Sequence, residues 1–201
     1  MLPTVPPPPR EPGCAWHAHQ HGTAAEPVAR AWLAGELGGA PAALALTRDA
    51  HGRPRLGPPF AHFSVSWSHS GAGLLVALGE DVEVGVDLER LRPRPRANAL
   101  AQRFFTAGEA EWLRRMPGAT RELAFVRLWC AKEAVLKAHG RGLAFGLHKL
   151  AFAERDDALV LAACDPALGV PVAWSLREFA PQPGYRAALA WRPRDATAAT
   201  A

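Results

Sequence analysis

Residues 82–89 alternate apolar and polar side chains without a break, reading Val-Glu-Val-Gly-Val-Asp-Leu-Glu. A period of two is typical of a β-strand, because successive side chains of a strand point to opposite faces of its sheet. The four apolar side chains therefore predict a face turned to a core, and Asp87 and Glu89 share the opposite face. This segment alone requires the chain to form a sheet with at least one buried face.

Asp87 and Glu89 stand two residues apart on the polar face of that predicted strand. At this separation two carboxylates can share one hard cation such as Mg²⁺, which takes few protein carboxylates and completes its shell with water and phosphate oxygens. Gly85 beside them removes a side chain where a ligand could approach closely. A solvated strand face without function explains the same alternation, so other residues have to decide between the two.

Helix patterns and strand patterns follow one another twice along the chain. The predicted helices are 27–37, a helix opened by a Thr106–Glu109 capping box and ending near 115, and 120–139. The predicted strands lie around 62–66, 73–78, 82–88, 149–153, 159–163, 172–179 and 185–191. Because helix precedes sheet in both rounds, we predict an α+β protein of two similar lobes.

A proline-rich link, Arg-Pro-Arg-Pro-Arg at 92–96, separates the two rounds. Links of this composition are stiff and favour a boundary between halves. We therefore divide the chain into an irregular Pro- and His-rich lead-in at 1–22, an N-terminal lobe at 23–96, a C-terminal lobe at 97–192 and a disordered tail at 193–201.

The 201 residues are 49% apolar and 21% charged, which fits a globular protein with a sizeable core. The formal net charge of +4 suits an anionic ligand, but the basic residues are not gathered into runs with aromatics, which argues against nucleic acid. Three cysteines without a Cys-x-x-Cys pair favour the reducing cytoplasm. The longest apolar stretch, 74–78, is too short to cross a membrane.

Only three of the 23 basic residues are lysines, and two of these, Lys132 and Lys137, lie in one predicted helix. Lys132 occupies a position in an apolar stripe, where an ammonium must reach water or meet an anion. Glu133 and Lys137 stand at i and i+4. An ordinary surface ion pair explains Glu133 and Lys137 as well as an anion site does, but it leaves Lys132 unexplained.

Ser68, His69 and Gly71 fall in a turn between two predicted strands. Hydroxyl, imidazole and backbone N–H groups in such a turn can bind a phosphate. A Ser-His nucleophile pair is the alternative, but neighbouring Ser and His do not make a catalytic triad, and the chain has no Gly-x-Ser-x-Gly motif. The sequence therefore favours phosphate contact at this turn.

Taken in order, these pieces resemble one enzyme family. The motifs are Ser68-His69-Ser70, the strand end 85–89, Phe-Phe-Thr-Ala-Gly-Glu at 104–109, and Trp-Cys-Ala-Lys-Glu-Ala-Val-Leu-Lys at 129–137 followed by Gly140 to Leu143. Together they closely resemble the 4′-phosphopantetheinyl transferases of the larger, surfactin-type group, in the holo-[acyl-carrier-protein] synthase superfamily. Gly-Arg-Pro at 52–54 resembles that family's Gly-Lys-Pro loop. The resemblance runs from about residue 52 to 145 and then weakens.

The resemblance implies an Mg²⁺-dependent enzyme that moves the 4′-phosphopantetheine arm of coenzyme A onto a serine of an acyl or peptidyl carrier protein and releases 3′,5′-ADP. It also implies two lobes related by a pseudo-twofold axis, each with a helix packed on a small antiparallel sheet, and an active site in the cleft between them. We expect a monomer with neither nucleic acid nor membrane among its partners. The alternative is a non-catalytic member of the fold that only binds coenzyme A or a nucleotide.

The same resemblance assigns roles to the motif residues. Asp87, Glu89 and Glu133 are expected to hold Mg²⁺, and Glu133 is also the expected base for the carrier serine. The expected coenzyme contacts are Lys132 and Lys137 at the pyrophosphate, Ser68 and His69 at the phosphates, and Arg53 at the 3′-phosphate. The arginines expected to meet an acidic carrier are Arg103, Arg114 and Arg115.

Three motif residues have simpler structural explanations. The capping box accounts for Glu109, so we predict a structural role for it. Trp129 and Cys130 fit buried positions of the long helix, Cys130 as a small hydrophobe.

The N-terminal part departs from the family pattern. Ser66 stands where asparagine is common, and the short lead-in leaves Arg30 as the nearby candidate for an adenine- or phosphate-side contact. Three histidines in the lead-in alternate like metal ligands but have no acidic partner at suitable spacing, so we favour no metal there. These histidines are His17, His19 and His21.

Overall fold

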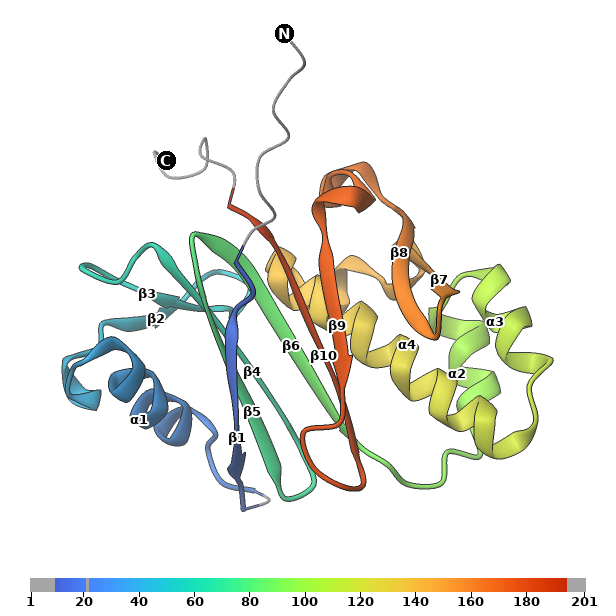
Figure 1. Ribbon diagram of the computed structural model, residues 1–201, viewed down its shortest axis with the longest axis horizontal. Helices are drawn as coiled ribbons and strands as arrows, with labels where there is room; N and C mark the ends of the chain where they lie inside the picture. Colours follow the sequence, from blue (N-terminus) through green and yellow to red (C-terminus); the bar gives the residue numbers. More distant parts are fainter. Residues whose placement is uncertain (1–9, 21, 195–201) are drawn as a thin grey trace, which may run out of the picture.

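In a computed structural model that describes residues 10–20 and 22–194, the chain forms four layers, helix, sheet, sheet and helix (Figure 1). Helix α1 (Glu26–Leu37) packs on the outer face of a five-stranded sheet. Helix α4 (Gly118–His139) packs on the outer face of a three-stranded sheet. The inner faces of the two sheets share a third cluster of buried side chains, so the core is divided into three parts.

All neighbouring strands within the sheets are antiparallel. The five-stranded sheet, in the order β1-β5-β4-β3-β2, comprises β1 (Gly13–Ala18), β2 (Leu46–Arg48), β3 (Pro54–Leu56), β4 (Phe63–Ser70) and β5 (Gly73–Glu80). The three-stranded sheet, in the order β6-β10-β9, comprises β6 (Val82–Arg90), β9 (Ser175–Phe179) and β10 (Tyr185–Pro193). A separate hairpin joins β7 (Leu150–Arg155) to β8 (Ala158–Cys164).

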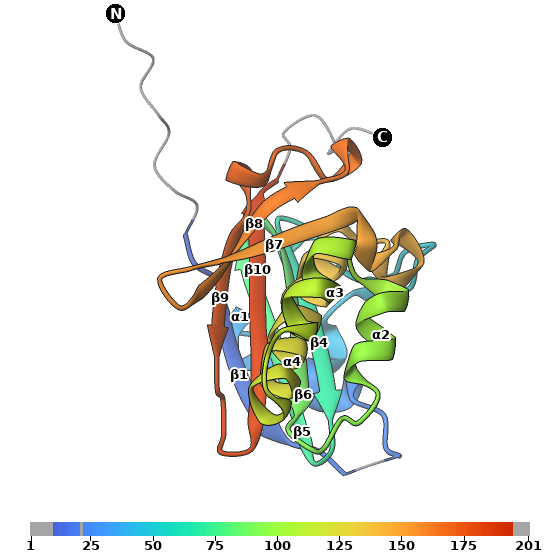
Figure 2. The same ribbon diagram turned by 90° about the vertical axis from the view of Figure 1, so that its right-hand side faces the viewer.

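Two short helices, α2 (Ala97–Phe104) and α3 (Ala107–Arg114), pack beside α4 (Figure 2). The predicted capping box is present: the Thr106 hydroxyl accepts the Glu109 N–H, and the Glu109 carboxylate accepts the Thr106 N–H. Helix α4 ends at Gly140, whose φ of 95° is left-handed, as glycine allows. Single 3₁₀ turns lie at Pro41–Ala43, Gly142–Phe145, Leu147–Lys149, Pro166–Leu168 and Pro171–Ala173.

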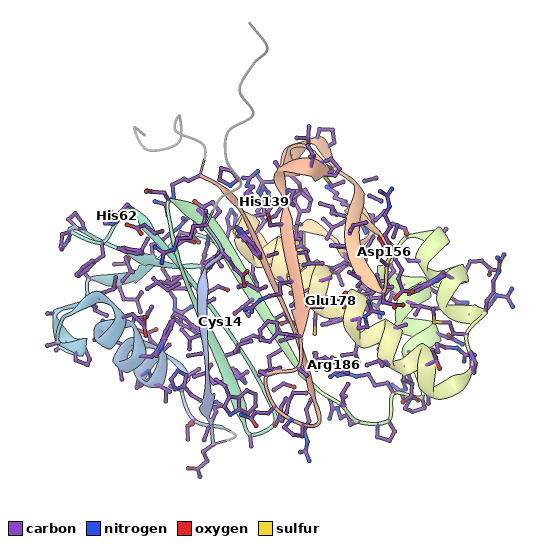
Figure 3. The ribbon with its side chains drawn as sticks, viewed as in Figure 1. Cys14, His62, His139, Asp156, Glu178 and Arg186 are labelled. Atoms are coloured by element: carbon purple, nitrogen blue, oxygen red, sulfur yellow. The ribbon has the colours of Figure 1, made fainter. Side chains whose placement is uncertain are left out.

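Arg127 fixes α4 against the strands that it covers. Its guanidinium bonds Glu178 of β9, which Figure 3 labels, at 2.8 Å and Glu154 of β7 at 2.5 Å.

Within the described ranges, no helix is both long and apolar enough to span a bilayer.

The alternation of β6 has the predicted buried face. Val82, Val84, Val86 and Leu88 are at most 2% exposed and lie between the two sheets. The polar face is not solvated, however, because α4 covers it. A Cβ at Gly85 would collide with the α4 backbone at Ala134 and Ala138. Gly85 therefore serves helix packing, and the expected ligand approach at this residue was wrong.

The α+β class with antiparallel sheets is confirmed, and each sheet carries a helix. The sheets are of unequal size, five strands against three. The helix expected at 27–37 and the strands expected near 62–66, 73–78 and 82–88 are present, the strands extending further than predicted.

Four local expectations differ from the structure. Ser68 and His69, expected in a turn, lie in β4, and of the three residues only Gly71 is in the turn. The lead-in expected to be irregular contains β1, an edge strand that gains its order by pairing with β5, about sixty residues later in the chain. Residues 171–173 form a 3₁₀ turn, so β9 starts at Ser175. Pro193 belongs to β10, whereas most of the expected tail, 195–201, and the start of the lead-in lie outside the described residues.

Strands β4 and β6 lie side by side, but serine side chains rather than a backbone ladder connect them. We call Ser64, Ser66, Ser68 and Ser70, which occupy every second position of β4, the serine seam. Backbone N–H groups of β6 donate to three of these hydroxyls at 3.0–3.1 Å: Val84 to Ser64, Val86 to Ser66, and Arg90 to Ser70. The contacts advance equally along both strands, so β4 and β6 run parallel.

Candidate active site

Four charged side chains meet where α4 crosses β6: Asp87 and Glu89 of β6, and Glu133 and Lys137 of α4. The contact of Gly85 with the small residues of α4 allows this close approach, since Glu133 and Lys137 flank Ala134 on the helix. The Lys137 ammonium lies 2.7 Å from Oδ1 of Asp87 and 3.1 Å from the Val86 carbonyl oxygen. The i and i+4 residues of α4 are therefore not a plain surface pair.

Each strand carboxylate is also bonded to the serine seam. Ser68 donates to Oδ1 of Asp87 at 2.9 Å, and Ser70 donates to Oε2 of Glu89 at 3.4 Å. Arg94, from the link after β6, donates to the same Glu89 oxygen at 2.6 Å. The strand, the seam and the link thus fix both carboxylates before any ligand binds.

The negative charge of Asp87 raises the pKa of both glutamates of the cluster, Glu89 and Glu133. Burial, together with the charges of Asp87 and Glu89, raises the pKa of Glu133 to about 7, although Lys137 opposes the shift. Burial also raises the pKa of Glu89, against the effect of Arg94. Three carboxylates face only two cations, so the site favours an additional positive charge.

The residues fit a hard cation such as Mg²⁺. Oδ2 of Asp87 is buried and has no hydrogen-bond partner among the described residues. All three acidic side chains can provide oxygen ligands to a metal ion. Within 10–20 and 22–194, no group of three or more His, Cys, Asp or Glu side chains is placed to hold a metal ion by itself, so water and substrate oxygens would have to complete the shell. Mg²⁺ is commonly held by one or two carboxylates, with water and substrate phosphate completing its shell, so an open arrangement suits it.

A cavity of about 180 Å³ adjoins these charges. Lys137 and Gly140 line it from the C-terminal end of α4, where Figure 3 labels His139. The Gly-Arg-Pro loop at 52–54 and Trp67 of β4 line it from the first lobe, and the Arg48 guanidinium lies 5.2 Å from the centre of the Trp67 ring. The cavity therefore lies between the lobes, with cationic walls that suit a phosphorylated ligand.

Lys132 lies outside this constellation. Its side chain is fully buried, and the ammonium bonds Glu109 at 2.7 Å and the carbonyl oxygens of Leu147 and Leu150 at 2.9 and 2.5 Å. An ammonium has three donors, and all are used here. The placement does not support the expected pyrophosphate contact of Lys132, and it gives Glu109 the structural role that was predicted.

Arg53 borders the cavity, but its guanidinium is buried. It forms an ion pair with Glu83 and donates to Ser64 at 2.8 Å. Burial lowers its pKa, although Glu83 opposes this. In this arrangement Arg53 holds β6 against the seam, and the expected 3′-phosphate contact would require Glu83 to share it.

The remaining expected residues are divided between surface and core. His69 is exposed, with its ring centre 5.1 Å from that of the buried His19. Arg30 bonds the Leu44 carbonyl oxygen and Glu26, so its guanidinium has a structural role. Two of the arginines expected to meet the carrier, Arg114 and Arg115, both bond Glu111 on the surface; the third, Arg103, lies over the ring of Phe104.

Sequence reasoning missed two neighbours of the site. Cys130 is buried as predicted, but it lies next to Asp87, and burial raises the pKa of its thiol, with the charges of Asp87 and Glu89 adding to the effect. Arg94 was hidden in a proline-rich link that indicated only a boundary. The available signal was its position five residues after Glu89 in a segment that the prolines stiffen.

The family model and the related sequences agree on one family. Residues 83–190 match the model of the 4′-phosphopantetheinyl transferase superfamily. The chain is 37% identical over 180 residues to 4′-phosphopantetheinyl transferase HetI of Nostoc sp., covering 86% of this chain and 73% of that protein. It is 39% identical over 89 residues to 4′-phosphopantetheinyl transferase psf-1 of Bacillus pumilus, covering 44% of this chain and 36% of that protein. The solved holo-[acyl-carrier-protein] synthase of Thermotoga maritima matches 56% of this chain and 64% of its own, with a TM-score of 0.46 and 20% identity.

Proposed function

The chain belongs to the 4′-phosphopantetheinyl transferase superfamily, and from this premise we propose that it moves the 4′-phosphopantetheine arm of coenzyme A onto a serine of an acyl or peptidyl carrier protein. The observation that carries the proposal is the meeting of Asp87, Glu89, Glu133 and Lys137 beside a cationic cavity between the lobes. Surface charge alone would not bring three carboxylates together next to a lysine that lines a cavity with arginine walls.

Lys137 is the residue that we propose for the pyrophosphate. Two of its three donors bond Asp87 and Val86, and its side chain is 28% exposed on the wall of the cavity. The third donor is thus available to a phosphate oxygen. Ser68 and His69 remain candidates for the coenzyme phosphates, with Ser68 also bonded to Asp87.

Asp87, Glu89 and Glu133 are the proposed holders of Mg²⁺, directly or through its waters. Bound there, Mg²⁺ would withdraw charge from the pyrophosphate as a Lewis acid. The unpartnered Oδ2 of Asp87 supports this assignment.

Glu133 is the proposed base. A carboxylate with a pKa of about 7 can take the hydroxyl proton of the carrier serine near neutral pH. The serine oxygen then forms a bond to the phosphorus that carries the pantetheine arm, the bridging P–O bond breaks, and 3′,5′-ADP leaves. Lys137 stabilises the negative charge that develops on the leaving phosphate.

We propose the same partners and setting as the sequence predicted: coenzyme A, an acyl or peptidyl carrier, a monomeric enzyme and the reducing cytoplasm. The three free thiols, Cys14, Cys130 and Cys164, are compatible with a reducing compartment. Arg103, Arg114 and Arg115 remain candidates for carrier contact.

Incubation of the purified chain with coenzyme A, Mg²⁺ and a panel of apo carrier proteins tests the proposal. Intact-protein mass spectrometry should show one phosphopantetheine added to at least one carrier, and Asp87→Asn should abolish the addition. If the chain binds coenzyme A but leaves every carrier unmodified, the non-catalytic alternative is favoured. No binding and no transfer would contradict both functions.

A further inference from the structure

Asp87 and Glu89 are held by the same arrangement, repeated two residues along the strand. Each carboxylate receives one hydroxyl of the serine seam and one cationic side chain. The two serines are two residues apart on β4, as the two carboxylates are on β6. The cation at Asp87 is Lys137, for which a role has been proposed above. The cation at Glu89 is Arg94, for which none has been proposed.

At Asp87, both contacts fall on a single oxygen. Ser68 and Lys137 bond Oδ1 at 2.9 and 2.7 Å, while Oδ2 is buried without a partner among the described residues. One oxygen is therefore fixed and the other is left for a ligand.

At Glu89, both contacts also fall on a single oxygen. Ser70 and Arg94 both bond Oε2, at 3.4 and 2.6 Å. Oε1 takes part in neither of these two contacts. The carboxylate is again anchored through one oxygen, which leaves the orientation of the other to be set by that anchor.

Arg94 is distinguished from its neighbours by where its side chain lies. In the link at 92–96, Arg92 and Arg96 are exposed, whereas the Arg94 side chain is only 15% exposed and its Nε is buried without a partner among the described residues. Pro93 and Pro95 fix the backbone on both sides of it, because the proline ring restricts φ. The link therefore turns one of its three guanidinium groups inward, toward Glu89.

From this geometry we infer that Arg94 is a positioning residue of the active site, which aims the other oxygen of Glu89 at the bound divalent cation, as Lys137 does for Asp87. The inference rests on the proposed function, because it assumes that the carboxylates hold a cation during transfer. Arg94 itself touches neither the substrate nor the reacting atoms.

A plain surface ion pair is the competing explanation for Arg94 and Glu89. Exposed pairs contribute little and tolerate exchange of Arg for other polar residues. Here the Glu89 side chain is only 21% exposed, and it faces Asp87 and Glu133 as well. Residues that orient metal-holding groups typically change metal affinity by about 10–100-fold when removed.

Binding of Mn²⁺ to the full chain, followed by electron paramagnetic resonance without carrier or coenzyme, tests the inference separately from transfer. We expect Arg94→Gln to weaken Mn²⁺ binding by about 10–100-fold, with Arg94→Lys in between because lysine keeps the charge but loses the planar donor geometry. Arg96→Gln, with the same charge change on an exposed neighbour, should match the wild type. Equal Mn²⁺ affinity in folded Arg94→Gln and Arg96→Gln overturns the inference.

Two further variants keep the result interpretable. Ser70→Ala removes the other contact to Oε2 of Glu89 and should also weaken Mn²⁺ binding. This variant replaces Arg94→Gln if Arg94→Gln fails to fold. Unchanged Mn²⁺ affinity in folded Ser70→Ala would then contradict the inference. Asp87→Asn tests the cation site itself. If Asp87→Asn loses Mn²⁺ binding while Arg94→Gln keeps it, only the positioning role fails, whereas loss of carrier modification alone concerns the proposed function.

Discussion

Helix α4 carries two lysine–carboxylate pairs, five residues apart, with the same 2.7 Å separation and opposite settings. Lys132 and Glu109 are 0% and 5% exposed, and every donor of Lys132 is used inside the protein. Lys137 is 28% exposed and keeps one donor for a ligand. The distance between the charges is thus no guide to their role. The unused hydrogen-bonding capacity and the open space beside it distinguish the two pairs.

The surroundings of the two pairs differ in the same sense. Glu109 is satisfied by its capping box and by the Phe152 N–H, so the Lys132 pair joins α3, α4 and β7. Oδ2 of Asp87 has no hydrogen-bond partner in 10–20 and 22–194, and two further carboxylates stand near this residue. The first pair is a closed structural connection, whereas the second is open to a cation and a phosphate.

The largest effect is expected at the buried pair of Lys132 and Glu109. Lys132→Met should lower the free energy of unfolding by about 3–5 kcal/mol, because it leaves the Glu109 carboxylate buried without its counter-charge. Urea denaturation followed by circular dichroism measures this. Lys132→Met combined with Glu109→Gln should be more stable than Lys132→Met alone, and a single variant as stable as the wild type would show that the two pairs are not different in kind.

At the partly exposed pair of Lys137 and Asp87, the expected effect is smaller and falls on the transfer rate rather than on stability. Lys137→Gln should reduce the rate of carrier modification by about 100–1,000-fold, the usual effect of removing one charge-stabilising donor. Stability should fall by less than in Lys132→Met, because Lys137 is 28% exposed and glutamine can still donate to Asp87. Single-turnover transfer assays and thermal unfolding of the same sample provide both readings. Loss of folding without a selective loss of transfer would place Lys137 with Lys132.

The smallest effect concerns pH. The pKa of Glu133 in the folded chain, about 7, lies above its usual 4.5, so the folded state binds more protons between these values. Stability without divalent cations should therefore fall as pH rises from about 5 to 8, by about 1–3 kcal/mol. Urea denaturation at several pH values should show a weaker dependence in Glu133→Gln. If the free energy of unfolding depends on pH equally in Glu133→Gln and the wild type, the pKa of Glu133 is not raised in the folded protein.

Much of this fold follows from local sequence patterns. The alternation at 82–89, the capping box at Thr106 and the glycine after His139 each specify an element through its own residues, and these elements are present. Strand β1 could not be found in this way. Its order comes from pairing with β5. Its own residues do not alternate apolar with polar side chains, and the alternating histidines continue past its end.

The candidate site shows the same limit. Asp87, Glu89, Glu133 and Lys137 were expected together, and α4 brings them together. The burial of Lys132 was not predictable from the helix pattern, because an apolar stripe does not reveal that Glu109 and two carbonyl groups will surround the ammonium. Arg94 escaped for a related reason: its contact with Glu89 depends on the path of the link in space.

The serine seam has a consequence for how the five-stranded and the three-stranded sheet are aligned with each other. A backbone ladder accepts almost any side chains, so the register of strands joined by one is set by which face of each strand is buried. Between β4 and β6 the bonds instead come from hydroxyl groups at alternate positions, and a slip of one residue would place Val65 and Trp67 opposite the N–H groups of β6. The alternate serines of β4 therefore fix the register of β6, and with it the position of the three-stranded sheet. Asp87 and Glu89 reach Ser68 and Ser70 only in that register.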